Sequence, residues 1–213
     1  MATRKKLTKK APVRAPASAG MLQLLVTLDD VKPAVWRRLL VPADFPLSLL
    51  HPVFQVALGW TNSHLHAWNI GGRRYAPDDG EVDVETENNE DFRLGDLVHA
   101  GSRFLYEYDF GDSWMHRVEV EKVLPVDPRF PWPACLDGKN ACPPEDCGGA
   151  PGYEELRRAL ASPRHPEHDE MRTWVGGYFD PAGFDANVVN GALREMWDVL
   201  TRPEPRRGAR SAR

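Results

Sequence analysis

The sequence has few cysteines and no long apolar segment, and both shortages restrict what the protein can be. No apolar run approaches the ~18 residues that a membrane-spanning helix needs, so no membrane contact is expected. The basic N-terminal stretch is not followed directly by an apolar segment with a cleavage-site pattern, which argues against a secretory signal. The three cysteines are an odd number, so any disulfide framework would leave one thiol unpaired. We therefore expect a cytoplasmic protein with reduced thiols.

The sequence also lacks the companion motifs of several enzyme and ion-binding classes. Asp109-Phe-Gly111 matches the magnesium motif of protein kinases, but no glycine-rich loop, strand lysine or His-Arg-Asp loop accompanies it. Gly148-Gly149 precedes a helical pattern, but no P-loop lysine follows, so a glycine turn is the better interpretation. The acidic residues of 78–91 lack the spacing of an EF-hand and indicate a solvated loop. Kinase, P-loop and EF-hand functions are therefore not expected.

Positive charge is scarce in the middle of the chain and concentrated at its ends. Eleven of the 27 Lys and Arg residues, but only one of the 31 Asp and Glu residues, lie in residues 1–20 and 202–213. The segment between these ends consequently has a net charge of −14. Both ends are rich in Ala, Pro, Ser or Gly and lack hydrophobic periodicity, so we interpret them as disordered basic tails. Such tails are suited to nucleic acid, although the acidic body would repel the same partner and the tails could instead aid solubility or contact the body.

Length and composition favour a single domain over residues 21–201. A chain of 213 residues that is 42% hydrophobic can bury one core, whereas two large domains would be crowded. Alternating apolar residues predict strands at 22–28, 35–41, 65–70, 73–75, 103–110 and 114–124. Helical spacing predicts a helix between Pro46 and Gly59, kinked or started later by Pro52, and helices near 153–161, 167–175 and 185–200. This order indicates an α+β fold with a mostly antiparallel sheet, one early helix and a C-terminal helical segment.

Three histidines form the first candidate for a chemical site. If the strand at 65–70 extends one residue earlier, His64 and His66 share one of its faces, because side chains repeat with period two. Two such imidazoles can chelate one metal ion, and His116 from a neighbouring strand would complete the set. Asp109 or Asp112 would then act as a carboxylate ligand or orient a histidine, so Asp109, Asp112 and His116 are also the catalytic candidates. Because His-x-His is a common pattern, the alternative is a set of buried histidines with structural hydrogen bonds.

Three cysteines form the second candidate, a structural zinc site. Cys135, Cys142 and Cys147 with His116 would make a Cys₃His site if the Pro- and Gly-rich segment around them folds back. Their spacing matches no standard zinc module, and isolated cysteines are often inert buried residues. A catalytic cysteine is less expected, because the neighbouring Glu145-Asp146 would raise the pKa of a thiol. Zinc is thus the possible cofactor.

Several long motifs resemble those of one protein family. They are Lys32-Pro-Ala-Val-Trp-Arg-Arg38, Gly59-Trp-Thr-Asn-Ser-His-Leu-His66, Asp109-Phe-Gly-Asp-Ser-Trp-Met-His116, Cys142-Pro-Pro-Glu-Asp-Cys-Gly-Gly149 with Gly152-Tyr153, Phe179-Asp-Pro181 and Phe184-Asp185. In this order they resemble the plasmid pRiA4b ORF-3-like family over all of the chain except the tails. The resemblance implies an α+β fold without an agreed reaction, in proteins found on plasmids and chromosomes and sometimes as passengers of insertion sequences. Some relatives carry a resolvase label, but no serine-recombinase active site or basic helix-turn-helix is evident in this sequence.

Three functional classes follow from these observations. The first, which we favour, is a non-catalytic binding or accessory protein for a protein partner or for nucleic acid, linked to mobile elements. The second is a metal-dependent, hydrolase-like enzyme built on His64, His66 and His116 with Asp109 or Asp112, in which the metal activates water. The third is an interaction domain in which these polar side chains only satisfy one another. Convergence of three or more of these side chains within about 4 Å of one point, in a concave and partly open pocket, would favour the second class.

Overall fold

The computed structural model describes residues 20–78, 85–126 and 132–202. The strands are β1 (Gly20–Leu28), β2 (Trp36–Pro42), β3 (His66–Ile70), β4 (Arg73–Ala76), β5 (Thr86–Asn88), β6 (Arg103–Tyr108), β7 (Trp114–Pro125) and β8 (Ala134–Lys139). The helices are α1 (Leu47–Leu58), α2 (Leu94–Leu97), α3 (Gly149–Ala161), α4 (His168–Trp174) and α5 (Ala186–Leu200). The two predicted tails lie outside the described residues, apart from Gly20 and Arg202, so their disorder stays a prediction.

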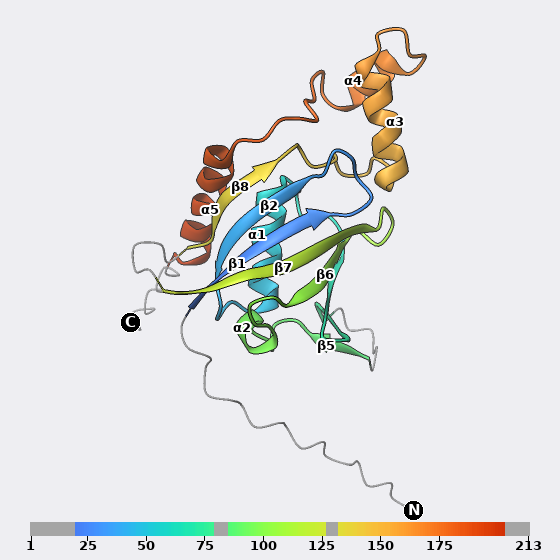
Figure 1. Ribbon diagram of the computed structural model, residues 1–213. Helices are drawn as coiled ribbons and strands as arrows, with labels where there is room; N and C mark the ends of the chain where they lie inside the picture. Colours follow the sequence, from blue (N-terminus) through green and yellow to red (C-terminus); the bar gives the residue numbers. More distant parts are fainter. Residues whose placement is uncertain (1–19, 79–84, 127–131, 203–213) are drawn as a thin grey trace, which may run out of the picture.

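The described strands form one sheet in the order β5-β4-β3-β6-β7-β1-β2-β8 (Figure 1). Every neighbouring pair is antiparallel except β4 and β5. Helices follow the strands at the C-terminal end of the chain, as the order of the sequence patterns indicates. The predicted α+β fold with a mostly antiparallel sheet is therefore confirmed. No helix of the described residues combines the length and apolar character that crossing a membrane requires.

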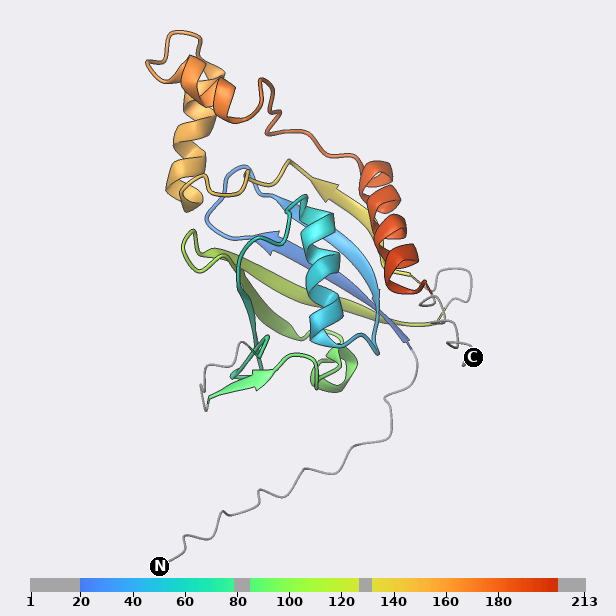
Figure 2. The same ribbon diagram turned by 180° about the vertical axis from the view of Figure 1, so that it is seen from behind.

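Helix α1 covers one face of the sheet, and the main core lies between them (Figure 2). The alternation along β1 directs Leu22, Leu24 and Val26 into this core, where each is almost fully buried. Of the described helices, none lies over the opposite face, which is turned toward the viewer in Figure 1.

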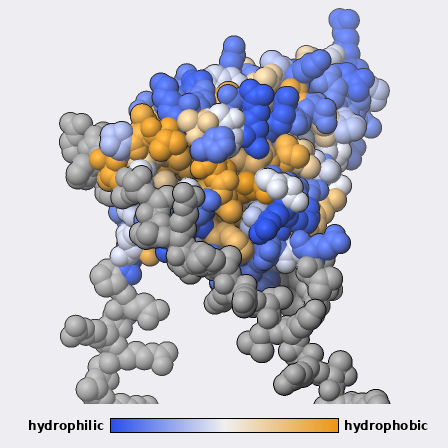
Figure 3. Space-filling model, turned by 60° about the horizontal axis from the view of Figure 1, so that its bottom comes forward, coloured by the Kyte–Doolittle hydropathy of each residue, from blue (hydrophilic) through white to orange (hydrophobic). Residues whose placement is uncertain are grey.

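Several large apolar side chains also stay exposed, among them Val123 on β7 and Val199 on α5. Figure 3 shows apolar surface gathered on the side of the molecule that faces down in Figure 1.

The start and end of α1 follow from its flanking residues. Pro46 is the extended N-cap residue, and its carbonyl accepts a hydrogen bond from the Leu50 N–H at 3.1 Å. Gly59 ends the helix in the left-handed region at φ 87°, where glycine carries no steric penalty. Pro52 lies inside the helix, so the expectation that it moves the helix start to a later residue is wrong. Eight residues of α1 are buried, and this packing holds the first turn in place despite the N–H that Pro52 lacks.

Three short elements and one boundary differ from the sequence-based expectation. β5 lies at the end of the segment expected as an acidic loop, of which residues 79–84 are outside the described part of the chain. α2 lies in residues for which no element is predicted, and β8 lies in the Pro- and Gly-rich segment expected as a loop and pairs with β2 although it contains Gly138. β3 begins at His66, so His64 precedes the strand and does not share the His66 face. Elements of three to six residues give too little periodicity to be recognised in the sequence.

Candidate functional site

Three segments meet at one end of the sheet, beside the root of α3. They are residues 59–65 between α1 and β3, the β6–β7 turn at 109–113, and residues 140–148 before α3. Each segment turns sharply through a residue with positive φ, namely Asn62 at 59°, Asp109 at 55° and Asp146 at 59°. Asn and Asp adopt this conformation more readily than other non-glycine residues. The local sequence thus permits the turns that bring the three segments together.

His64, Asp109 and Asp146 converge at this junction. His64 Nε2 lies 3.2 Å from Asp146 Oδ1 and 3.6 Å from Asp109 Oδ2. The three ligand atoms all lie within 4.8 Å of one another. The Asp109 side chain is 10% exposed, His64 27% and Asp146 72%, so the cluster is enclosed on the Asp109 side and open on the Asp146 side. An imidazole nitrogen and two carboxylates in this arrangement are a suitable ligand set for a metal ion.

The nitrogen of His64 is close to both carboxylates without being hydrogen-bonded to either. His64 Nε2 is a buried atom and has no hydrogen-bond partner of acceptable geometry. His64 Nε2 is therefore close to the two carboxylate oxygens, at 3.2 and 3.6 Å, but the geometry is not that of a hydrogen bond. Buried polar atoms are normally paired, so this nitrogen is an exception that calls for an explanation.

Asp109 is held rigidly by its own turn. Its Oδ1 accepts hydrogen bonds from the backbone N–H groups of Gly111 at 3.0 Å and Asp112 at 3.3 Å. The Ser113 N–H closes the turn by donating to the Asp109 carbonyl at 2.6 Å. These bonds use one carboxylate oxygen of Asp109 and leave Oδ2 toward His64. The turn thereby orients a ligand atom before any ion is bound.

Glu145 anchors the 140–148 segment to the body of the protein. Its carboxylate accepts hydrogen bonds from the Thr61 N–H at 3.2 Å, from the Thr61 hydroxyl and from the Tyr108 hydroxyl. Burial by itself would raise the pKa of Glu145, but the hydrogen bonds from Thr61 and Tyr108 outweigh it and lower that pKa. Burial and the hydrogen bond to Glu145 raise the pKa of Tyr108. Glu145 is therefore an ionised anchor beside the cluster, and its neighbour Asp146 supplies the ligand oxygen.

Asp112 has a different role from the one expected for it. Its Oδ2 accepts a hydrogen bond from the Gly148 N–H at 3.1 Å, next to the N-terminus of α3. A Cβ atom on Gly149 would lie only 2.7 Å from the Asp112 carbonyl oxygen, so the two segments are in close contact. The Asp112 carboxylate thus lies beside Gly148 and Gly149, where the N-terminus of α3 favours a negative charge. Asp112 is not among the three clustered residues.

His66 and His116 lie in the core, apart from the cluster. The His66 ring stacks on the His51 ring with centroids 3.5 Å apart, and His66 Nε2 lies 3.1 Å from Asn89 Nδ2. His116 is fully buried, with Nδ1 3.3 Å from the Tyr106 carbonyl oxygen. Burial lowers the pKa of His66 to about 3, with a smaller effect of His51, and burial lowers the pKa of His116 to about 4. The structure therefore does not bring the three histidines to one point, because His64 precedes β3 and turns toward Asp109.

The cysteines do not converge either. Cys135 and Cys142 are buried, and Cys147 is partly buried. In the described part of the chain, no cluster of three His, Cys, Asp or Glu ligand atoms includes a cysteine. Burial raises the pKa of Cys142 and Cys147 to about 12, and the charges of Asp112 and Asp146 add to the effect at Cys147. The structure therefore does not bring the three cysteines to one point with His116 as a Cys₃His site requires.

Sequence reasoning identified His64 and Asp109 but missed Asp146. Asp146 stands between Glu145 and Cys147, where it was considered only for its effect on the thiol. A second cluster, Glu155, His165 and Glu167, was also missed and lies at the α3–α4 corner. No motif spacing links either set, since their ligands come together through the path of the chain.

The open face of the sheet carries a shallow groove of about 530 Å³. Leu25 and Leu105 line it together with charged side chains that include Arg103, Arg117 and Glu119. None of its lining residues belongs to the cluster of His64, Asp109 and Asp146.

Comparison with known proteins is consistent with this fold. The uncharacterised protein y4hQ of Sinorhizobium fredii (strain NBRC 101917 / NGR234) is 38% identical over 181 residues, which cover 84% of this chain and 93% of that protein. The crystal structure of a protein of unknown function, MM3350 from Methanosarcina mazei Go1, matches with a TM-score of 0.74 and 30% identity. That match covers 80% of this chain and 98% of the archaeal chain. The family model described as plasmid pRiA4b ORF-3-like protein matches residues 20–188, and the chain belongs to this family.

Proposed function

We propose that the protein binds one divalent metal ion between His64, Asp109 and Asp146 and is a non-catalytic, metal-dependent binding protein. The convergence of three ligand atoms from three separate segments carries this proposal. Catalytic metal sites combine open coordination positions with a cavity for the substrate. No residue of the cluster lines the groove on the open sheet face or the grooves beside Asp30 and Trp132, and this supports binding in preference to hydrolysis.

The distances fit a bound ion. Zinc bonds of about 2.0–2.2 Å in tetrahedral geometry place the ligand atoms roughly 3.3–3.6 Å apart. The separations of 3.2 Å and 3.6 Å from His64 Nε2 to the two carboxylate oxygens are close to these values. Mixed nitrogen and oxygen ligands without sulfur suit Zn²⁺ or Mn²⁺ better than Ca²⁺. Asp146 is the exposed ligand, so open coordination positions would face solvent and a partner group on its side.

Electrostatics favours the same conclusion. Asp109 and Asp146 are neighbours, with Glu145 next to Asp146 in sequence and Asp112 three residues after Asp109. Bringing carboxylates this close is unfavourable unless a cation offsets the repulsion. The competing interpretation is an ion pair in which a protonated His64 contacts both carboxylates and needs no metal. The two interpretations predict different results for metal titration.

The test is elemental analysis of tag-free protein together with calorimetric titration of Zn²⁺ and Mn²⁺. We expect one ion per chain, with affinity reduced by about 10–100-fold in His64→Gln, Asp109→Asn and Asp146→Asn. His165→Gln at the second cluster and Cys142→Ser are the matched controls and are expected to bind as the original protein does. Equal binding by His64→Gln and the original protein would overturn the proposal. Loss of binding in Cys142→Ser would move the site to the cysteines.

A second candidate function is contact with nucleic acid through the basic tails, in an accessory role linked to mobile elements. The concentration of eleven basic residues in the two ends favours it. Fluorescence anisotropy with a labelled DNA duplex would compare the full chain with residues 21–201. We expect affinity only in the full chain and a steep decline with salt. Equal affinity of both proteins would contradict a role of the tails.

A further inference from the structure

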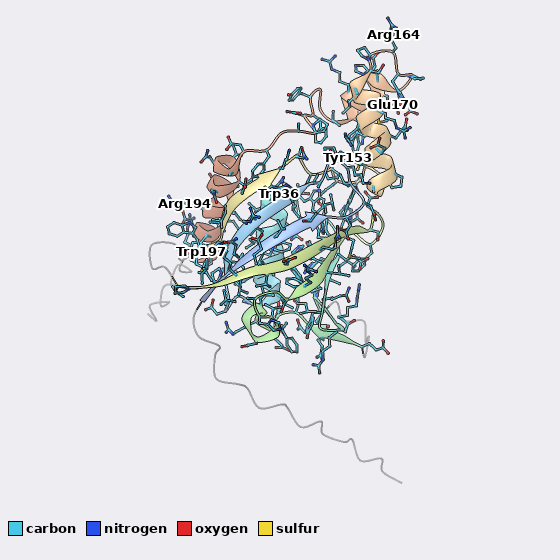
Figure 4. The ribbon with its side chains drawn as sticks, viewed as in Figure 1. Trp36, Tyr153, Arg164, Glu170, Arg194 and Trp197 are labelled. Atoms are coloured by element: carbon cyan, nitrogen blue, oxygen red, sulfur yellow. The ribbon has the colours of Figure 1, made fainter. Side chains whose placement is uncertain are left out.

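Residues 141–181 form an arm that stands out from the sheet. The arm contains α3 and α4, which lie beyond the end of the sheet in Figures 1 and 2. Its two stems meet at the root, where the Ala141 N–H donates to the Pro181 carbonyl at 3.0 Å. In Figure 4, Tyr153 lies on the part of the arm near the sheet, whereas Arg164 lies at the far tip. The arm is thus joined to the body at one end only.

The contacts between arm and body are concentrated at that root. Trp60 Nε1 donates to the Pro143 carbonyl at 2.9 Å, and the Gly148 N–H donates to Asp112. Arg157 of α3 donates to the Lys32 carbonyl. Helix α4 has no buried residue. Tyr153 and Leu156 of α3 are buried, whereas the exposed α4 and the single root are the properties of a segment that opens locally at low free energy.

The metal cluster lies across this root. Asp146 belongs to the arm, whereas His64 and Asp109 belong to the body. Only two residues separate Asp146 from α3, and the junction is tight, because a Cβ on Gly152 would lie 1.9 Å from the Cys147 carbonyl oxygen. A displacement of Asp146 is therefore transmitted to the first turn of α3. An ion bound to all three ligands would cross-link the arm to the body.

We infer that the ion at His64, Asp109 and Asp146 controls whether the arm is docked on the sheet. This inference rests on the proposed metal binding and adds its consequence for the rest of the molecule. With the ion bound, the root opens only after the ion has dissociated. Without it, Asp109 and Asp146 repel each other across the joint, and the arm detaches more often. The metal thereby sets the position of a surface that includes Trp174 and Tyr178, which are 47% and 82% exposed.

Hydrogen–deuterium exchange of the full chain, with and without Zn²⁺, tests the inference. An ion that binds only the docked state stabilises it by a factor of 1 + [L]/Kd, so at 100 times Kd the exchange rate falls up to about 100-fold. We expect this protection at residues 143–160, at 61–65 and at 109–113. The second cluster, Glu155–His165–Glu167, lies within the arm, so an ion there would not join arm to body and would leave the exchange at 61–65 and 109–113 unchanged.

Two variants separate the possibilities. In His165→Gln the protection by zinc is expected to persist, and in His64→Gln it is expected to vanish. If zinc binds at one site that requires His64 but exchange at 143–160 is unchanged, the arm inference is overturned while the metal site stands. If calorimetry detects no binding that depends on His64, both the metal site and the arm inference fail. If protection is lost in His165→Gln and kept in His64→Gln, zinc acts within the arm and the inference is wrong.

Discussion

The side chain of Asn190 on α5 makes both hydrogen bonds that a neighbouring strand would make with Cys135 on β8. Asn190 Nδ2 donates to the Cys135 carbonyl at 2.8 Å, and the Cys135 N–H donates to Asn190 Oδ1 at 2.8 Å. β8 is the last strand of the sheet, so its outer backbone groups would otherwise be free to pair with another chain. Trp197, labelled in Figure 4, helps to hold α5 by stacking on Phe45 with centroids 5.6 Å apart. α5 thus closes the β8 edge.

Replacing this amide tests how much the edge contact contributes. Asn190→Asp removes the donor to the Cys135 carbonyl and sets a carboxylate against it. We expect the free energy of unfolding to fall by about 1–3 kcal/mol in urea denaturation. Asn187→Asp makes the same chemical change on an exposed position of α5 and is expected to have little effect. Similar losses in both variants would show that the amide pairing contributes nothing specific.

Arg37 is a buried cation that is solvated by backbone carbonyls. Its Nε donates to Ala57 O at 2.8 Å, and its Nη1 donates to Trp36 O at 2.8 Å and to Lys139 O at 3.1 Å. Arg37→Lys keeps the charge but lacks the planar fork, so we expect a loss of about 2–3 kcal/mol in unfolding free energy.

The control for Arg37 is an exposed arginine. The Arg103 side chain is 78% exposed and pairs with Glu119, so Arg103→Lys is expected to change stability by less than about 0.5 kcal/mol. If thermal and urea unfolding show the same small change for Arg37→Lys, the carbonyl contacts of Arg37 are not stabilising.

His116 makes stability depend on pH. Burial lowers its pKa to about 4 in the folded protein, against about 6.5 when exposed. The unfolded chain therefore binds a proton that the folded chain does not, and stability present above pH 6.5 is lost as the pH falls toward 4. Trp60 and Tyr106, which face the ring, provide no carboxylate that would offset a charge on it.

The pH effect is measured by urea unfolding at pH 7.5 and pH 5. Each pKa unit corresponds to about 1.4 kcal/mol. From pH 7.5 to pH 5, the free energy of unfolding of His116→Leu is therefore expected to fall by about 2 kcal/mol less than that of the original protein. His99 is exposed, and His99→Gln is expected to lose as much as the original protein does. An unchanged pH dependence in His116→Leu would contradict the assignment.

Two glycine-to-alanine substitutions are expected to act in opposite directions. Gly149 has φ 66°, and an added Cβ would lie 2.7 Å from the Asp112 carbonyl oxygen, so Gly149→Ala should destabilise by about 2 kcal/mol or more. Gly191 lies within α5, and an added Cβ would meet no atom within 4 Å. Gly191→Ala should stabilise by about 0.5–1 kcal/mol, because alanine is the better helix former. Urea unfolding of both variants checks the pair, and a change of equal sign in the two would refute it.

The long elements could be predicted from the sequence because their periodicity reports burial of one face. The patterns at 22–28 and 114–124 correspond to β1 and β7, and the pattern at 185–200 corresponds to α5. β8 could not be found in this way, because Cys135 is its only buried residue and its partners lie on β2 and α5. The first residue of β3 could not be found from the sequence either. Because β3 begins at His66, His64 precedes the strand and turns toward Asp109.

Fold class, family and the charge of the tails could be predicted from the sequence, which also indicated His64 and Asp109 as candidate site residues. These properties depend on residues close together in the chain, whose spacing or composition carries the information. The tertiary structure alone decided that Asp146 completes the cluster, and that His66, His116 and the cysteines stay outside it. A ligand set is defined by distances of a few ångströms between atoms, and these depend on how turns such as those at Asn62, Asp109 and Asp146 direct segments that are distant in sequence. Periodicity shows which face of an element is buried, but it does not show which segments meet at its end.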